Sequence, residues 1–224
     1  MDSGFGFSIL NASLALLAIA FLIGSIPFGV IVGRLFYRSD LRQSGSGNIG
    51  AANALRSYGK IGGAVVLLLD ASKGFIVTSL AQPWPWEIFA RYCLCVVVTS
   101  AEGGAAAVIG LAAVLGHCFS PWLRFRGGKG VATWLGVLFG LSWIAGVAFV
   151  VVWLLVVLPM RYASLGSMIA SVLSPLALWF LSHDLVITGC ATAAALLIVW
   201  KHRENITRLR EGRENKITFR KASA

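Results

Sequence analysis

Long runs of apolar residues, separated by short polar stretches, make up most of the chain. A helix that crosses a membrane needs about 20 such residues, within a range of roughly 17–25. Runs of suitable length occupy residues 8–33, 61–80, 103–120, 131–158, 164–181 and 184–200. Because the apolar residues lie in long uncharged runs rather than in short alternating strands, the pattern predicts an all-α, polytopic membrane protein.

Two stretches leave the number of crossings open. Residues 84–101 are apolar, but Pro85, Glu87 and Arg91 interrupt them. Residues 131–158 form one long run that fits either one crossing or two short ones. Hydropathy alone is therefore compatible with more than one topology.

The distribution of lysine and arginine decides between these topologies, because basic loops are retained on the cytoplasmic side of a membrane. Apart from Lys73 and Arg91, the basic residues fall in four groups, namely loop 34–60, loop 118–130, Arg161 and the tail 201–224. These groups share one side only under a single scheme. In that scheme the first helix runs from outside to inside, residues 84–101 add no crossing, and residues 131–158 turn near Ser142 to cross twice.

The scheme predicts a single integral membrane domain over residues 1–224, a bundle of seven transmembrane helices with an outside N-terminus and a cytoplasmic C-terminal tail. The spans are expected near residues 8–33, 61–80, 103–120, 131–142, 144–158, 164–181 and 184–200. The fourth and fifth spans are short, since ~12–15 residues reach only ~18–22 Å at 1.5 Å per residue. We expect Pro27 to kink the first helix and the polar residues 212–224 to be frayed.

Composition excludes several other classes of protein. The chain is 58% hydrophobic and 12% charged, whereas soluble domains are about 25% charged, so a soluble globular domain, a disordered chain and a secreted disulfide scaffold are ruled out. The net charge of +10 is attributed to cytoplasmic loops that face anionic lipid or an anionic substrate, and not to nucleic-acid binding. The four cysteines form no C-x-x-C pair and have no histidine at zinc-ligand spacing, so no metal site is expected.

Loop 44–60 is the first candidate binding site, because it combines glycines with polar side chains before a short helix-like stretch. Ser46 and Asn48 precede that stretch, and Arg56 follows within it. Glycine lets a backbone approach a ligand closely, and free amides at a helix N-terminus favour an anion. Arg56 would add a bidentate donor. The alternative is an ordinary flexible cytoplasmic loop.

Loop 124–133 is the second candidate. Gly127 and Gly128 free the backbone, and Lys129 sits where a helix begins near Val131, so an anion there would meet an ammonium group and a positive helix end. The segment fails the nucleotide-binding loop pattern, since Gly130 follows Lys129 and no strand precedes it. The alternative is a lysine that extends to the membrane interface.

Further candidates lie at the ends of later spans and inside one of them. Ser164 opens the sixth span, either as an N-cap or as a phosphate donor. His202 and Asn205 lie one helical turn apart after the last span, unless this is only a basic surface helix on anionic lipid. Asp70 and Lys73 lie within the second span, where charges often mark function, although we favour a structural ion pair because the two can neutralise each other.

Five sequence segments occur in this order in one known family. They read SGNIGAAN, LDASKG, GHCFSPWLRFRGGKGVAT, RYASL and HRENITRLREGRENK, and through them residues 20–216 resemble the PlsY family, the bacterial acyl-phosphate:glycerol-3-phosphate acyltransferases. The resemblance implies seven spans with an outside N-terminus, as the charge argument does independently. It also implies a bacterial cell (inner) membrane location, with the active site facing the cytoplasm.

The resemblance implies a reaction as well. An acyl group passes from acyl phosphate to the sn-1 hydroxyl of glycerol 3-phosphate, which gives lysophosphatidic acid and phosphate in the first step of phospholipid synthesis. No cofactor is needed, and the partners are the two substrates, membrane lipid and, in function, a soluble phosphate acyltransferase that makes acyl phosphate. Because phosphate is a good leaving group, we expect direct attack without an acyl-enzyme, with either His202 or a substrate phosphate oxygen as the base.

The family's functional residues can be assigned where the motifs match. The resemblance implies catalytic roles for Lys129, His202 and Asn205, and phosphate binding by Ser46, Asn48, Asn53, Arg56, Gly127, Gly128 and Ser164. The chain departs from the family at Ala52, where the usual GATN motif has threonine, so a hydroxyl that would donate to phosphate is missing. The alternative function is a transporter of phosphate or a phosphoester, against which the absence of a visible internal repeat counts.

Overall fold

Helices joined by short connections account for most of the protein in the computed structural model, which describes residues 3–83 and 103–217. The helices are α1 (Ser3–Ser25), α2 (Phe28–Tyr37), α3 (Ala51–Ala81), α5 (Gly104–Cys118), α6 (Val131–Leu141), α7 (Trp143–Met160), α8 (Ala163–Ser182), α9 (Leu185–Lys201) and α10 (Arg203–Arg210), with short 3-10 turns at Leu41–Gln43 and Pro121–Leu123. The described residues contain no strand, which confirms the all-α prediction. The uncertain stretch 84–101 lies outside the described residues.

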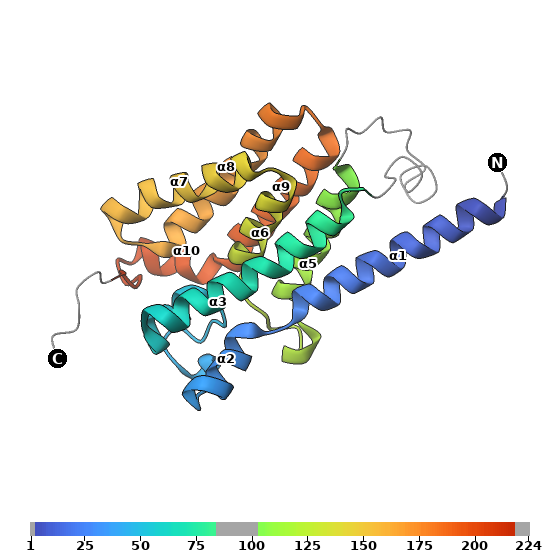
Figure 1. The fold of residues 1–224 in the computed structure, drawn as a ribbon. Coiled ribbons are helices and arrows are strands. Elements are labelled where there is room, and N and C mark those ends of the chain that lie inside the picture. The colour runs from blue at the N-terminus through green and yellow to red at the C-terminus, as the bar shows by residue number, and fades with distance from the viewer. Residues whose placement is uncertain (1–2, 84–102, 218–224) are drawn as a thin grey trace.

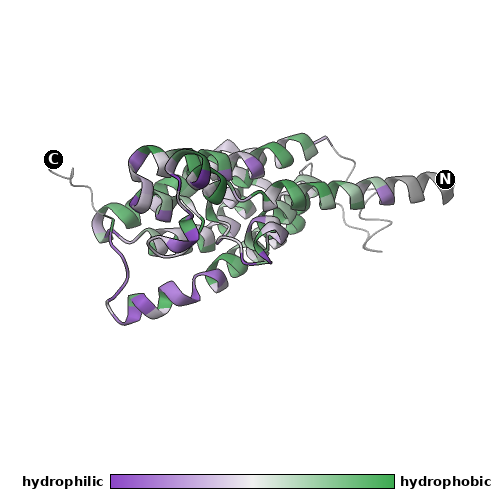
Figure 2. Cartoon of the chain, turned by 90° about the horizontal axis from the view of Figure 1, so that it is seen from below, coloured by the Kyte–Doolittle hydropathy of each residue, from purple (hydrophilic) through white to green (hydrophobic). Residues whose placement is uncertain are grey.

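Several of these helices are long and apolar enough to cross a membrane. By length and composition they are Asn11–Tyr37, Ala51–Ala81, Gly104–Leu123, Trp143–Met160 and Ala163–Ser182, with α9 and α10 as a further span if this pair, bent by 55°, counts as one. Figure 1 shows α3 running along the other helices, whereas the N-terminal half of α1 projects beyond them. Figure 2 shows that many hydrophilic residues gather toward the end of the molecule that carries the C-terminus.

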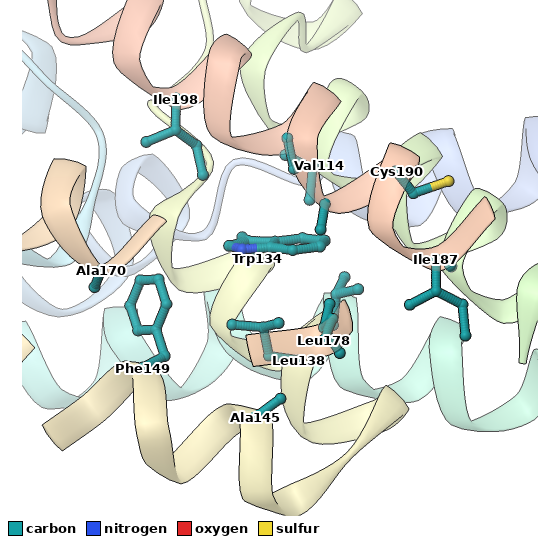
Figure 3. Packing of buried hydrophobic residues seen from close by; sticks show 14 of the residues in the cluster. Val114, Trp134, Leu138, Ala145, Phe149, Ala170, Leu178, Ile187, Cys190 and Ile198 are labelled. Carbon is teal, nitrogen blue, oxygen red and sulfur yellow. The ribbon is translucent and has the colours of Figure 1, made fainter. Parts of the chain in front are cut away.

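A buried cluster around Trp134 forms the main apolar core. Leu138 of the same helix and Val114, Phe149 and Ile198 from three other helices, α5, α7 and α9, lie around the Trp134 ring (Figure 3). The indole N–H, which cannot reach water there, donates to Ser174 Oγ at 3.0 Å. A buried indole usually has such a partner for its N–H. Because the residues of this cluster come from α5, α6, α7, α8 and α9, these five helices share one core.

The backbones of α3 and α6 pack at very short range. A Cβ atom on Gly136 of α6 would lie 1.9 Å from the carbonyl oxygen of Ala71, and one on Gly74 of α3 would lie 2.1 Å from that of Thr133. Small residues permit such close approach between membrane helices, where dispersion and short-range contacts replace the hydrophobic effect as the driving force. The sequence at these two positions therefore fixes how α3 lies against α6.

The predicted turn near Ser142 is confirmed. Helix α6 ends at Leu141, Ser142 is extended with φ −159° and ψ 123°, and α7 begins at Trp143. The two helices then pack against each other, because Gly146 leaves space for the Phe139 ring, which a Cβ would approach to 2.5 Å. Helix α6 is as short as expected, but α7 has 18 residues and is longer than the predicted 144–158.

The first apolar run is broken rather than merely bent. Helix α1 ends at Ser25 and α2 begins at Phe28, with Pro27 between them, because proline removes an amide donor and blocks the preceding turn. The predicted kink at Pro27 is thus confirmed, but the helix continues past the predicted end at residue 33, as far as Tyr37.

The tail differs from the expectation of a frayed segment over its described part. Ile217 N donates to Arg161 O at 2.8 Å, and Arg161 Nε donates to Ile217 O at 3.0 Å. Residues 213–217 are therefore attached to the chain just before α8, and the expectation was wrong there because backbone pairing of this kind leaves no signature in composition. Residues 218–224 lie outside the described residues.

The α3–α6 contact gives a test of stability. Gly136→Val should lower the free energy of unfolding by about 1–3 kcal/mol, as overpacking does, because its Cβ has no room beside Ala71. Thermal unfolding of detergent-purified protein measures this effect. Gly189→Ala is the matched control, since a Cβ there meets nothing within 4 Å, and equal losses for both variants would contradict the close packing.

Candidate active site

A cavity of about 470 Å³ opens between α3, α6, α7, α8 and the chain after α9. Its polar residues are Ser46, Asn48, Arg56, Lys60, Asp70, His117, Lys129, Ser164, Ser167, His202, Asn205, Glu214 and Asn215. Apolar side chains form the rest of its wall, chiefly Leu55, Leu67, Leu135, Phe149, Val150, Trp153, Leu154 and Ile217. The cavity therefore offers cations to an anion on one part of its surface and an apolar wall to a hydrocarbon chain on another.

Segments far apart in sequence meet in this cavity, as the motifs predict. Of the candidate residues, those that line it are Ser46, Asn48, Arg56, Lys129, Ser164, His202 and Asn205. Asn53, Gly127 and Gly128 are not among the lining residues. These three residues instead make contacts that hold in place the loops that carry the lining residues.

The loop before α3 is held in place by Asn53. Its side chain is completely buried, and its amide nitrogen donates to the carbonyl oxygens of Leu41, Ser44 and Asn48 at 3.1, 2.9 and 2.9 Å. Its carbonyl oxygen accepts a hydrogen bond from Ser46 N at 2.9 Å. Asn53 therefore has no polar atom to spare for an anion, and its contacts fix the loop that presents Ser46 and Asn48.

Arg56 and Ser46 approach each other at the cavity wall. An Arg56 guanidinium nitrogen donates to Ser46 Oγ at 3.3 Å, so both groups can face one anion. A guanidinium group is well suited to bind an oxyanion, because its planar fork of N–H donors matches the oxygens of a phosphate.

Lys129 extends into the cavity from the loop before α6. Its Nζ donates to the side-chain oxygen of Asn205, which links the glycine-rich loop to α10. Burial lowers its pKa from 10.5 to about 8, with a further lowering by Arg208 and Arg56 that Glu214 and Glu204 partly oppose. An ammonium in such a setting gains from a bound anion, because the anion supplies the charge that water would otherwise screen.

The two glycines before Lys129 pack on the end of α5 instead of lining the cavity. A Cβ on Gly127 would lie 2.0 Å from His117 O, and one on Gly128 would lie 2.1 Å from His117 Nε2. The Gly128 amide donates to His117 O at 3.0 Å, so it is not free to bind an anion. The glycines are thus required for close approach to His117, and the expected cradle of backbone amides is not found at Gly128.

His202, which also lines the cavity, has a fixed tautomer. Its Nδ1 lies 2.7 Å from Ile198 O, and because a carbonyl oxygen can only accept, Nδ1 carries the proton and Nε2 carries a lone pair. Burial, followed by the charge of Lys129, lowers the pKa of His202 to about 4. The ring is therefore neutral near pH 7 and can accept a hydrogen bond from a hydroxyl group.

Glu214 is a cavity residue that sequence reasoning missed. One carboxylate oxygen accepts from Ser164 Oγ at 2.7 Å and from Asn205 Nδ2 at 2.6 Å, and the other accepts from Arg208 Nε at 2.8 Å. Burial alone would raise the pKa of Glu214, but these three hydrogen bonds lower it. The only signal in the sequence is an acidic residue within a basic tail that was expected to be frayed. Lys60, which also lines the cavity, was missed as well.

Comparison with known proteins gives one consistent answer. A family model described as glycerol-3-phosphate acyltransferase matches residues 14–212. Curated proteins named glycerol-3-phosphate acyltransferase include that of Nitrobacter winogradskyi, 45% identical over 89% of this chain and 93% of its own length, and that of Sinorhizobium fredii, 44% identical over 93% and 94%.

Solved structures agree with the sequence relatives. A crystal structure of PlsY, an integral membrane glycerol 3-phosphate acyltransferase in its glycerol 3-phosphate form, matches with a TM-score of 0.81 and 37% identity, over 92% of this chain and 96% of that chain. The lysophosphatidic acid form of PlsY matches with a TM-score of 0.79 and 35% identity, over the same shares of the two chains.

Proposed function

We propose that this chain, which belongs to the glycerol-3-phosphate acyltransferase family, takes its acyl group from an acyl phosphate and attaches it to the sn-1 hydroxyl of glycerol 3-phosphate. It is an integral membrane enzyme that acylates glycerol 3-phosphate to lysophosphatidic acid in phospholipid synthesis. The observation that supports acyl phosphate as the acyl donor is the composition of the cavity wall. Cationic and polar groups adjoin an apolar wall there, which suits a phosphate joined to a hydrocarbon chain.

The polar side chains of the cavity form two groups that can each hold a phosphate. Ser46 and Arg56 form the first group, beside the start of α3. Lys129, Asn205 and Ser164 form the second, linked through Glu214. Both substrates carry phosphate, so two cationic groups in one cavity support a pair of phosphorylated reactants bound side by side.

The apolar wall would hold the acyl chain of the donor. Leu67 of α3, Leu135 of α6, and Phe149 and Trp153 of α7 lie along it. Burial of a methylene group is worth about 0.8 kcal/mol, so a few methylene groups on this wall would contribute substantially to binding. The same wall would exclude water from the acyl carbon, which protects the donor from hydrolysis.

The reaction then needs no covalent enzyme intermediate. The hydroxyl oxygen of glycerol 3-phosphate bonds to the acyl carbon, the bond from that carbon to the phosphate oxygen breaks, and inorganic phosphate leaves with its electron pair. The Lys129 ammonium stabilises the negative charge that develops on the leaving phosphate and the carbonyl oxygen. His202 Nε2 orients glycerol 3-phosphate by accepting a hydrogen bond from its neighbouring sn-2 hydroxyl, which leaves the proton of the sn-1 hydroxyl free to transfer.

The proton of the hydroxyl passes to a phosphate oxygen of the substrate. With a pKa of about 4, His202 is a weaker base than a phosphate monoester, whose second pKa is about 6. Of the two bases that the sequence leaves open, the pKa of His202 thus favours the substrate phosphate. His202 and Asn205 then act by orienting the bound glycerol 3-phosphate, and neither takes a proton from it.

The membrane arrangement belongs to the same proposal. It comprises seven spans in the single domain 1–224, an outside N-terminus, and an active site that faces the cytoplasm of a bacterial inner membrane. The long helices, the short apolar α6 and the bent α9–α10 pair supply enough crossings for this scheme. A soluble enzyme that makes acyl phosphate would deliver the donor from the cytoplasm. The transporter alternative is set aside, because the relatives are acyltransferases.

Removal of the Lys129 ammonium tests its assignment. Lys129→Met should lower kcat by about 10²–10³-fold, the usual loss for one charge-stabilising donor, while the protein still folds. Phosphate release from palmitoyl phosphate with glycerol 3-phosphate, by detergent-purified enzyme, measures this loss. Lys216→Met is the control, because Lys216 lies over the Tyr162 ring and not in the cavity wall. A Lys129→Met enzyme that keeps more than about a tenth of wild-type kcat would contradict the assignment.

The lowered pKa of Lys129 predicts the alkaline limb of the pH profile. Only the ammonium form binds an anion, so kcat/KM should be highest below the pKa and fall as pH rises through about 8. Lys129→Arg keeps a cation at every accessible pH, so its residual activity should lack that fall. Initial rates at subsaturating substrate, measured from about pH 6.5 to about pH 10, give the profile. An unchanged limb in the arginine variant would assign the limb to another group.

The missing hydroxyl at position 52 predicts a gain of affinity. Ala52 lines the cavity in the first turn of α3, and Ala52→Thr would add a donor beside Ser46. A hydrogen bond to a charged group is worth about 1.5–3 kcal/mol, so KM for glycerol 3-phosphate should fall about tenfold or more. Ala52→Val has the same shape without the hydroxyl and serves as the control. If the two variants behave alike, no phosphate lies next to residue 52.

A further inference from the structure

Three ionisable side chains meet inside the bundle directly behind the loop that carries Lys129. Lys73 Nζ lies 2.8 Å from Asp70 Oδ1, 3.0 Å from His117 Nδ1 and 3.0 Å from Ile26 O. The side chains of Lys73, Asp70 and His117 are only 2%, 1% and 4% exposed. The Lys73 ammonium thus donates hydrogen bonds to His117 and Ile26 and forms an ion pair with Asp70, whose carboxylate oxygens make no hydrogen bond.

The ammonium of Lys73 fixes the protonation pattern of His117. Because an ammonium can only donate, His117 Nδ1 must accept, so the ring is neutral and carries its proton on Nε2. The same ammonium also donates to Ile26 O, at the break between α1 and α2. The His117 ring is therefore anchored to two other parts of the bundle, α3 directly and the α1–α2 break through Lys73.

The loop 127–129 is built around His117. Both glycines approach it too closely for any Cβ, since Gly127 meets its carbonyl oxygen and Gly128 meets its Nε2. The Gly128 amide donates to the same carbonyl oxygen at 3.0 Å. Lys129 follows immediately, so the orientation of His117 determines where the Lys129 side chain enters the cavity.

We propose that Asp70, Lys73 and His117 are positioning residues for Lys129. Asp70 holds the ammonium of Lys73, Lys73 holds the ring of His117, and His117 holds the two glycines that precede Lys129. The inference rests on the proposed role of Lys129 in the acyl transfer. It assigns a catalytic purpose to an ion pair within the membrane that the sequence suggested was structural.

The energetic character of the triad supports a positioning role. Buried ion pairs contribute little net stability, because the cost of removing two charges from water offsets their attraction. A side chain such as methionine would fill the same space without that cost. The charged triad instead fixes orientation, because the hydrogen bonds of the Lys73 ammonium to His117 Nδ1 and Ile26 O hold the His117 ring in one position.

A double-mutant cycle tests the contact between His117 and Gly128. Gly128→Ala should lower kcat at least tenfold, because its Cβ needs the space of the His117 ring, and His117→Ala should lower kcat similarly by removing the support. If both act through the same contact, the double variant loses no more than the worse single variant. Losses that multiply would show that the two residues act independently, and would overturn the proposal.

A conservative variant separates positioning from packing. An asparagine at position 117 keeps an oxygen that can accept from Lys73 near the place of Nδ1. His117→Asn should therefore recover at least tenfold of the kcat that His117→Ala loses, with KM for glycerol 3-phosphate changed less than twofold in both. Equal kcat values for the asparagine and alanine variants would mean that the bond to Lys73 is irrelevant.

A neutral version of the ion pair keeps the proposal testable if single changes unfold the protein. Lys73→Met alone leaves Asp70 as an unpaired buried charge, whereas the double variant Asp70→Asn with Lys73→Met leaves none. This variant should melt close to wild type, yet lose at least tenfold in kcat and show faster amide hydrogen exchange in residues 124–131. Thr78→Val is the control, because it removes a buried hydroxyl from the same helix α3 away from the loop.

The exchange measurement also distinguishes this inference from the proposed function. If wild-type enzyme shows no turnover with palmitoyl phosphate, the proposed donor is wrong, and the exchange rates of residues 124–131 still report on the triad. If the neutral variant keeps both wild-type kcat and wild-type exchange in this loop, the triad is only a packing element and the inference is overturned.

Discussion

A half-buried ammonium group without a full anionic partner, that of Lys129, is the feature on which the rest of the site depends. Lys129 contacts the neutral amide oxygen of Asn205, and Glu214, the nearest acidic group in that network, already accepts from Ser164, Asn205 and Arg208. The cation is thus held where solvent is scarce and negative charge is shared. Because burial lowers the pKa of Lys129 to about 8, a bound anion would stabilise both the charge and the arrangement around it.

The arrangement of the helices could largely be predicted, because hydropathy and positive charge act along the chain. The turn at Ser142 follows from the need to keep the basic groups on one side, and the helix break at Pro27 follows from the chemistry of proline. The same local reasoning could not show that residues 213–217 attach beside Arg161, since a short stretch of backbone pairing depends on partners more than fifty residues away.

The sequence indicates which segments form the site more reliably than it indicates what each residue does there. Asn53 stands in a motif with Ser46 and Asn48, and nothing local distinguishes an asparagine that binds a ligand from one that holds a loop. Only the carbonyl oxygens that surround its side chain decide this. Gly127 and Gly128 illustrate the same limit, because a glycine that frees an amide and a glycine that permits close packing look identical in a sequence.

Two histidines of opposite tautomer line the cavity, and their difference has a physical cause. His202 Nδ1 faces a carbonyl oxygen, which can only accept, so its Nε2 is left with a lone pair. His117 Nδ1 faces an ammonium group, which can only donate, so its Nε2 carries a proton. Neither ring can exchange roles without breaking its bond to the protein. The cavity therefore has a built-in polarity, with a hydrogen-bond acceptor at the end of α9 and a hydrogen-bond donor at the end of α5, and this polarity is set by the protein alone.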